Sequence, residues 1–133
     1  MKYQLEHCIG SRLRRLSRIA DRHIRKFLGD HKITENQMTI LFTIHELGRV
    51  EQGRVGEVLC LERSTVSRNI KLLEKQNLLM RTTEYRPEVE LTDQGMDLVK
   101  VLIPQWEKAM DVLVGQLEDD GLSGLQKLES KLA

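Results

Sequence analysis

The hydrophobic period changes within residues 53–92, and this change restricts the fold more than any other feature of the chain. Along residues 63–75 the apolar side chains recur every three or four positions, which is the period of a helix. Along residues 88–92 apolar and polar side chains alternate, as in a half-buried strand. A shorter helix is predicted over residues 53–61, with an apolar side made of Val55, Val58 and Leu59. Two helices joined by a tight turn and followed by a hairpin make a winged helix-turn-helix.

The helix predicted over residues 63–75 carries cations and small hydroxyls on the side opposite Val66, Ile70 and Leu73. Arg and Lys reach phosphates or guanine edges, while Ser and Thr let the backbone approach DNA closely. We therefore interpret this helix as a DNA recognition helix. The alternative is a basic face that only keeps the helix soluble. The residues expected to contact DNA are Arg63, Ser64, Thr65, Ser67, Arg68, Lys71 and Lys75.

Residues 78–92 are predicted to form a hairpin, or wing, beside this helix, with Asn77 as a left-handed cap just past the helix end. Three glutamates offset the cations of the hairpin, so its attraction to a minor groove is expected to be weak. Arg86, beside the tip, is the side chain expected to enter that groove. The alternative is a hairpin that only braces the recognition helix. The wing residues assigned to DNA are Arg81, Thr82 and Arg86.

Helices are predicted on both sides of this unit, so the fold class is mainly α with one β-hairpin (α+β). A first helix covers about residues 3–28, and a second runs from a capping box of Thr34 and Gln37 to Gly48. A long helix follows Thr92, with Pro104 as its expected kink, and a short one opens near residue 123. The predicted domains are an N-terminal dimerisation helix (1–33), the winged helix-turn-helix (34–92) and C-terminal dimerisation helices (93–133).

Length, composition and charge are those of a compact regulator. The chain of 133 residues has one domain's length, and its 40% hydrophobic content suffices for a core. The formal net charge is only +1, but cations are concentrated in residues 1–26 and acidic residues in 104–133. No apolar run is long enough for a membrane span and no secretory leader is present, so we expect a cytoplasmic protein without a membrane partner.

Motifs of enzymes and cofactor sites are missing from the sequence. It has no Gly-rich phosphate loop, no nucleophile elbow and no His-Glu-x-x-His motif. The four histidines are not spaced as metal ligands, and no cysteine or carboxylate completes a metal site. We therefore expect no enzymatic activity, no metal and no cofactor.

Two cysteines fit a reducing compartment rather than a disulfide scaffold. A helix N-terminus favours the reactive thiolate, whereas Cys8 is expected about one turn inside the first helix. Cys60 is expected on the apolar side of the turn before the recognition helix. Buried cysteines that act as small hydrophobic residues are the default interpretation, and thiol-based redox sensing, by Cys8 before Cys60, is the alternative.

Four spaced elements follow one another in the middle of the chain: Gly56-Glu57-Val58-Leu59, Ser64-Thr65-Val66-Ser67-Arg68, Leu73-Glu74-Lys75 with Leu78-Leu79, and Val89-Glu90-Leu91-Thr92-Asp93-Gln94-Gly95. Together they resemble the MarR (multiple antibiotic resistance regulator) family, a resemblance that covers about residues 5–130 and is most specific over residues 38–95. The chain departs from the family pattern in three ways. Its short hairpin loop lacks the usual Asp-x-Arg signature, Asn77 replaces a glycine, and Leu72 stands where a polar residue is more common.

The resemblance implies a sequence-specific transcriptional regulator that binds a pseudo-palindromic operator in double-stranded DNA. It further implies a homodimeric repressor that a small-molecule effector releases from DNA. From family geometry, the candidate residues of an effector pocket are Arg18, His45 and Trp106. Besides the redox-sensing regulator, the alternative is a winged-helix protein-interaction module whose N-terminal arginines bind an acidic partner.

The apolar stripes of the terminal helices also predict a homodimer. They are longer than a small winged domain can cover, and leaving apolar surface exposed costs about 25 cal/mol per Å². The alternative is that the first stripe packs only on the chain's own long helix. Two recognition helices related by a twofold axis would read half-sites about one helical turn apart. The predicted dimer interface contains Leu5, Ile9, Leu13, Leu16, Leu113, Leu117, Leu125 and Leu128.

Overall fold

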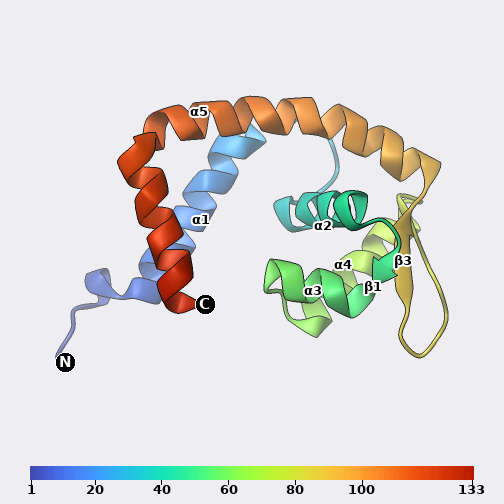
Figure 1. Ribbon diagram of the computed structural model, residues 1–133, viewed down its shortest axis with the longest axis horizontal. Coiled ribbons are helices and arrows are strands. Elements are labelled where there is room, and N and C mark those ends of the chain that lie inside the picture. Colours follow the sequence, from blue (N-terminus) through green and yellow to red (C-terminus); the bar gives the residue numbers. More distant parts are fainter. The chain divides into compact units, whose positions relative to one another are not determined.

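The computed structural model describes residues 1–133, which form two compact units. One unit contains residues 31–103, and the other contains residues 1–30 and 104–133. The elements, labelled in Figure 1, are the 3-10 turn η1 (Leu5–His7), α1 (Ile9–Arg25), α2 (Glu35–Leu47), β1 (Val50–Glu51), α3 (Gln52–Leu59), α4 (Arg63–Lys75), β2 (Leu79–Arg81), β3 (Glu88–Leu91) and α5 (Asp93–Leu132). The predicted class, mainly helical with a hairpin, is confirmed.

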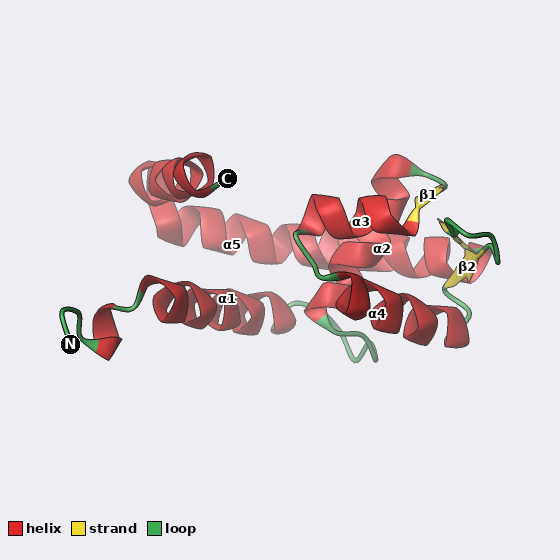
Figure 2. Cartoon of the chain, turned by 90° about the horizontal axis from the view of Figure 1, so that it is seen from below, coloured by secondary structure: helices red, strands yellow, loops and turns green.

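The core of the 31–103 unit lies among α2, α3 and α4, which contact one another and are grouped together in Figure 2. Its fully buried side chains include Ile40 and Leu41 of α2, Val55 of α3, and Ile70 of α4. The prediction that Val58 belongs to the apolar side of α3 is wrong, because this side chain is 46% exposed. The eight-residue helix turns only one narrow side towards its neighbours, which leaves Val58 outside the contact.

The start of α2 is fixed by the predicted capping box. The Thr34 hydroxyl accepts from the Gln37 backbone N–H at 3.2 Å, and the Gln37 side chain accepts from the Thr34 N–H at 3.0 Å. The helix ends at Gly48, whose φ of 72° lies in the region that favours glycine. Both predicted ends of this helix are confirmed.

A small antiparallel sheet with strand order β1-β3-β2 follows the helices. The predicted hairpin is confirmed as β2 and β3, which pair Leu79 with Leu91 and Arg81 with Val89. Strand β1 was not predicted, and it pairs Val50 with Val89. The hairpin loop, residues 82–87, extends beyond the paired strands (Figure 1).

The base of the hairpin is tied to the start of α5. Asn77 adopts a left-handed conformation with φ of 61°, as predicted, and its carbonyl accepts a 2.7 Å hydrogen bond from the Thr92 hydroxyl. The Thr92 hydroxyl oxygen in turn accepts from the Gly95 N–H at 3.0 Å. A Cβ on Gly95 would overlap the carbonyl oxygen of Leu78 and lie 2.9 Å from its carbonyl carbon. Only glycine allows α5 to begin this close to the hairpin.

The first helix, α1, begins later than predicted. Residues 3–8 form no α-helix, and α1 has 17 residues with Cys8 as its N-cap. Residues 1–8 contain no Ser, Thr, Asp or Asn, and the N-cap Cys8 makes no side-chain capping hydrogen bond, so no cap fixes an earlier start. Cys8 therefore lies at the N-terminus of the helix and not one turn inside it, which corrects the prediction.

Helix α5 continues through Pro104 with helical dihedral angles and breaks at Glu118, where φ is 58° and ψ is −177°. The expected kink at Pro104 is therefore replaced by a break 14 residues later, which starts the final helical segment before residue 123. The break separates two stretches of leucine that follow different helix axes. No helix of the structure has the length and apolar character that a membrane span requires.

The terminal helices keep much of their apolar surface open within the single chain. No residue of α1 is buried, and Ile9 and Leu16 are 65% and 59% exposed. Leu13 and Leu113 are partly buried. The other predicted interface residues are exposed, namely Leu5, Leu117, Leu125 and Leu128. Packing on the chain's own long helix therefore does not bury this stripe.

Candidate nucleic-acid interface

Helix α4 separates its core side from its cationic side as its sequence predicted. Val66, Ile70 and Leu73 are buried against the rest of the 31–103 unit. The exposed cations of the opposite side are Arg63, Arg68, Lys71 and Lys75. None of them takes part in an ion pair, so their charges are free to attract an anion.

The cationic side is slightly hollowed. A shallow depression of about 490 Å³ follows the helix for three turns, and its lining consists of Ser64, Ser67, Arg68, Lys71, Leu72 and Lys75. Five of the seven predicted recognition residues thus line one continuous surface, and a sixth, Arg63, is exposed at the first turn of the helix. Thr65 is the exception, because its side chain is partly buried towards the flank of the helix.

A close approach between α3 and α4 sets the position of the recognition helix. A Cβ on Gly56 would lie 3.1 Å from Val66 Cγ2 and 3.3 Å from the Leu61 carbonyl oxygen, so a larger residue would push the helices apart. Cys60 ends α3 in a left-handed conformation with φ of 53°, and the chain then turns into α4 after Glu62. The predicted tight turn is confirmed, and glycine is the residue that lets it pack.

A chain of side-chain hydrogen bonds, which the sequence analysis did not predict, holds α4 against α2. Gln37 is 5% exposed, and its side-chain N–H donates to Asn69 Oδ1 at 3.2 Å. The Asn69 amide donates in turn to the Thr65 carbonyl at 3.0 Å. The capping residue of α2 is thereby also a polar anchor for α4. The sequence signal was Asn69, a polar residue beside the apolar side of the helix.

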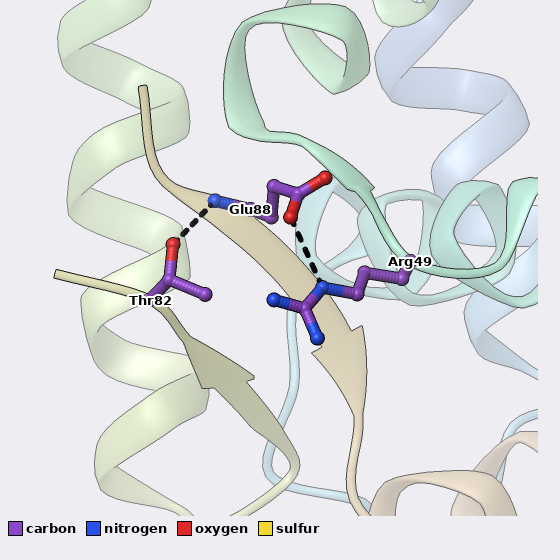
Figure 3. Close-up of polar contacts among 3 residues, drawn as sticks. All are labelled: Arg49, Thr82 and Glu88. Carbon is purple, nitrogen blue, oxygen red and sulfur yellow. Dashed lines mark hydrogen bonds and ion pairs between the residues drawn. The ribbon is translucent and has the colours of Figure 1, made fainter. Parts of the chain in front are cut away.

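The hairpin is held by polar contacts within it and with neighbouring residues (Figure 3). The Thr82 hydroxyl oxygen accepts from the Glu88 backbone N–H at 2.9 Å, and Arg49 Nε bonds the Glu88 carboxylate at 3.1 Å. Arg81 lies 3.9 Å from the carboxylate of Glu74 on α4. Two of the three predicted wing contacts are therefore engaged with the protein itself. These contacts support the bracing role of the hairpin.

Arg86 differs from the other two wing residues. It is exposed in the loop and forms no ion pair, and its neighbour Tyr85 is 99% exposed. A hollow of about 1100 Å³ separates this loop from the turn between α3 and α4. Arg63 on one side and Arg86 on the other both line it. The lining also contains Glu51, Glu57 and Glu62, so the hollow carries charges of both signs.

Of the remaining candidates, Cys60 alone lines one of these hollows. The expectation that the cysteines are buried is wrong, since Cys8 and Cys60 are both exposed free thiols. The side chain of Cys60 leaves the core because the residue ends a helix in the left-handed region. Arg18 and His45 are exposed and Trp106 is partly buried, and none of them lines either hollow. Their assignment to an effector pocket stays a prediction.

Comparison with known sequences identifies the part of the chain that carries the family signature. The MarR family model matches residues 33–84. An uncharacterized HTH-type transcriptional regulator of Bacillus subtilis, YwaE, is 24% identical over 110 residues, which are 80% of this chain and 64% of that protein. The HTH-type transcriptional regulator SarZ of Staphylococcus epidermidis is 29% identical over 80 residues, or 57% and 54% of the two chains. The matches thus span less than two thirds of these relatives, which are transcriptional regulators and not enzymes.

Solved structures share the fold over nearly the whole chain. BpsR of Bordetella bronchiseptica, whose DNA binding is regulated by 6-hydroxynicotinic acid, has a TM-score of 0.86 at 23% identity and covers 98% of this chain and 96% of its own. A mutant of E. coli MarR in complex with operator DNA has a TM-score of 0.81 at 18% identity, with coverage of 98% and 99%. Residues 33–84 thus match the MarR family model, and the chain as a whole has the winged-helix fold of these solved structures.

Proposed function

We propose that this protein is a homodimeric transcriptional regulator that binds a pseudo-palindromic operator through α4. The observation that carries the proposal is the exposed side of this helix, where Arg63, Arg68, Lys71 and Lys75 are free of ion pairs. Free cations beside small hydroxyls suit a major groove lined by phosphates and guanine edges. Arg68 lies near the middle of this side and is assigned to a base, whereas Lys71 and Lys75 are assigned to phosphates.

The dimer rests on the apolar surface of the terminal helices. Leucines and isoleucines on α1 and α5 remain exposed in the single chain, and a second copy would remove the same surface from water. Dimerisation also doubles the DNA contacts, because each subunit brings one recognition helix to one half-site. The predicted pseudo-palindromic operator follows from this symmetry.

Repression that a small molecule relieves is the further part of the proposal. Structures of the same fold include PcaV of Streptomyces coelicolor in complex with its natural ligand and NadR in complex with 4-hydroxyphenylacetate. Both are 22% identical to this chain, so the class of effector is carried over only as a small organic molecule. A winged helix that only binds proteins would have no use for unpaired cations and hydroxyls opposite its core.

Selection from random DNA tests the proposal. The wild-type protein is incubated with a pool of random duplexes at low salt, and bound DNA is recovered and amplified over several rounds. We expect enrichment of an inverted repeat with half-sites about one helical turn apart. A pool that stays random after repeated rounds would contradict sequence-specific binding.

The wing is expected to contribute less than the recognition helix. Arg86→Ala should weaken binding to the selected operator less than Arg68→Ala does, because a single cation at the hairpin tip adds one minor-groove contact. The affinity lost by Arg86→Ala should be largest on operators flanked by A·T runs, since a narrow minor groove attracts arginine most. Fluorescence anisotropy on two operators that differ only in these flanks measures both effects. A larger loss for Arg86→Ala on both operators would invert the ranking.

A further inference from the structure

One apolar side chain stands among the cations of α4. Leu72 is 44% exposed, whereas the core-side residues Val66, Ile70 and Leu73 are each at most 3% exposed. Leu72 is therefore not part of the hydrophobic core of the 31–103 unit. An exposed leucine loses the benefit of burial in the free protein, and it regains this benefit only when something apolar covers it.

The surroundings of Leu72 indicate what covers it. It lines the same depression as Arg68, Lys71 and Lys75, and it is the one apolar member of that lining. Residues three and four positions apart are neighbours on a helix surface, so Leu72 lies directly beside Arg68 and Lys75. Because these cations are unpaired, whatever reaches Leu72 also meets uncompensated positive charge. A partner with an apolar group embedded in negative charge fits this surface.

DNA offers such a group in its major groove. The 5-methyl group of thymine is apolar, and aliphatic side chains contact it there. Arg68 and Leu72 are four residues apart, which is about 6 Å along a helix axis and corresponds to about two base-pair steps. We propose that Leu72 selects thymine by contact with its 5-methyl group, about two base pairs from the guanine read by Arg68. This proposal rests on the proposed function and adds a specificity-determining residue to it.

Replacement of thymine by deoxyuridine tests the contact, since it removes the methyl group and keeps the base pair. Each thymine of the selected operator is replaced in turn, symmetrically in both half-sites, and Kd is measured by fluorescence anisotropy. For the wild-type protein, we expect one symmetric pair of positions at which uracil weakens binding by about fourfold per lost contact. For Leu72→Ala, thymine and uracil should bind equally at that pair.

Leu47→Ala is the matched control, because Leu47 is 46% exposed and lies on α2 outside the depression. This variant should keep the full thymine preference. We expect the two variants to have equal unfolding midpoints, because both side chains are exposed in the wild-type protein. Equal midpoints would exclude a general loss of structure as the cause of any difference in DNA binding.

Two results overturn the proposal, and they differ in what else they affect. If the wild-type protein binds its operator but no thymine-to-uracil change alters Kd, or if Leu72→Ala keeps the same preference, Leu72 does not read thymine and the proposed function stands. If the wild-type protein enriches no DNA sequence, both proposals fail together.

Discussion

Replacing Ile9 and Leu13 by aspartate is expected to convert the protein into monomers that no longer bind the operator tightly. Both side chains lie on the apolar stripe of α1, where Ile9 is 65% exposed and Leu13 is partly buried in the single chain. In a dimer, each aspartate would place an unpaired charge against an apolar surface, at a cost of several kcal/mol per ion. Size-exclusion chromatography with light scattering should give the mass of one 15.4 kDa chain, against two for the wild type.

The control carries the same change of charge on the opposite side of α1. The double variant Arg15→Gln/Arg22→Gln lowers the net charge by two, as Ile9→Asp/Leu13→Asp does, and both arginines are exposed. This variant should remain a dimer. A dimeric Ile9→Asp/Leu13→Asp protein with wild-type affinity for the operator would mean that the terminal helices do not form the interface.

The variant Gly95→Ala is expected to lose a large part of its folding stability. Its new methyl group would overlap the Leu78 carbonyl, so the start of α5 would have to move away from the hairpin. That movement strains the 2.7 Å hydrogen bond from the Thr92 hydroxyl to the Asn77 carbonyl. Overpacking together with a weakened hydrogen bond should cost about 3 kcal/mol, which is a large share of a typical stability of about 5–15 kcal/mol. Thermal unfolding should show a Tm lower by about 10 °C.

Gly53→Ala is the matched control for this variant. Gly53 also lies in a helix of the 31–103 unit, and a Cβ there would meet no atom within 4 Å. Because alanine is the better helix former, this variant should be as stable as the wild type or more stable by up to about 1 kcal/mol. Both variants are compared at one protein concentration, since the Tm of a dimer depends on it. Equal melting of the two would show that the hairpin accommodates the extra methyl group.

The parts of the fold that the sequence predicted correctly depend on local patterns. The spacing of Val66, Ile70 and Leu73 places the cations of α4 on the opposite side whatever the rest of the chain does. The capping box of Thr34 and Gln37 involves residues three positions apart, so it is visible in the sequence. Alternation along β3 likewise predicts the hairpin without knowledge of its partners.

The parts that could not be predicted depend on contacts between distant residues. Strand β1 has two residues, too few to show a period, and it exists because Val50 pairs with Val89. The Arg81–Glu74 and Arg49–Glu88 ion pairs join residues that are far apart in the sequence. A count of the charges within the hairpin therefore could not show that Arg81 and Glu88 are paired with residues outside it. The break of α5 falls at Glu118, three residues from the nearest glycines, whereas the helix continues through Pro104, where the sequence predicted a kink.

The most direct test of the central claim, that the exposed side of α4 reads DNA, compares Arg68→Ala with Lys75→Ala. Affinity for the selected operator and for a scrambled duplex is measured over a range of salt concentrations. Arg68→Ala should lose about 1–3 kcal/mol on the operator, with relaxed preference at one base pair and little change on scrambled DNA. Lys75→Ala should weaken both duplexes alike and reduce the salt slope by about one unit for each lost phosphate contact. Unchanged affinity and preference in Arg68→Ala would contradict the assignment of α4 as the recognition helix.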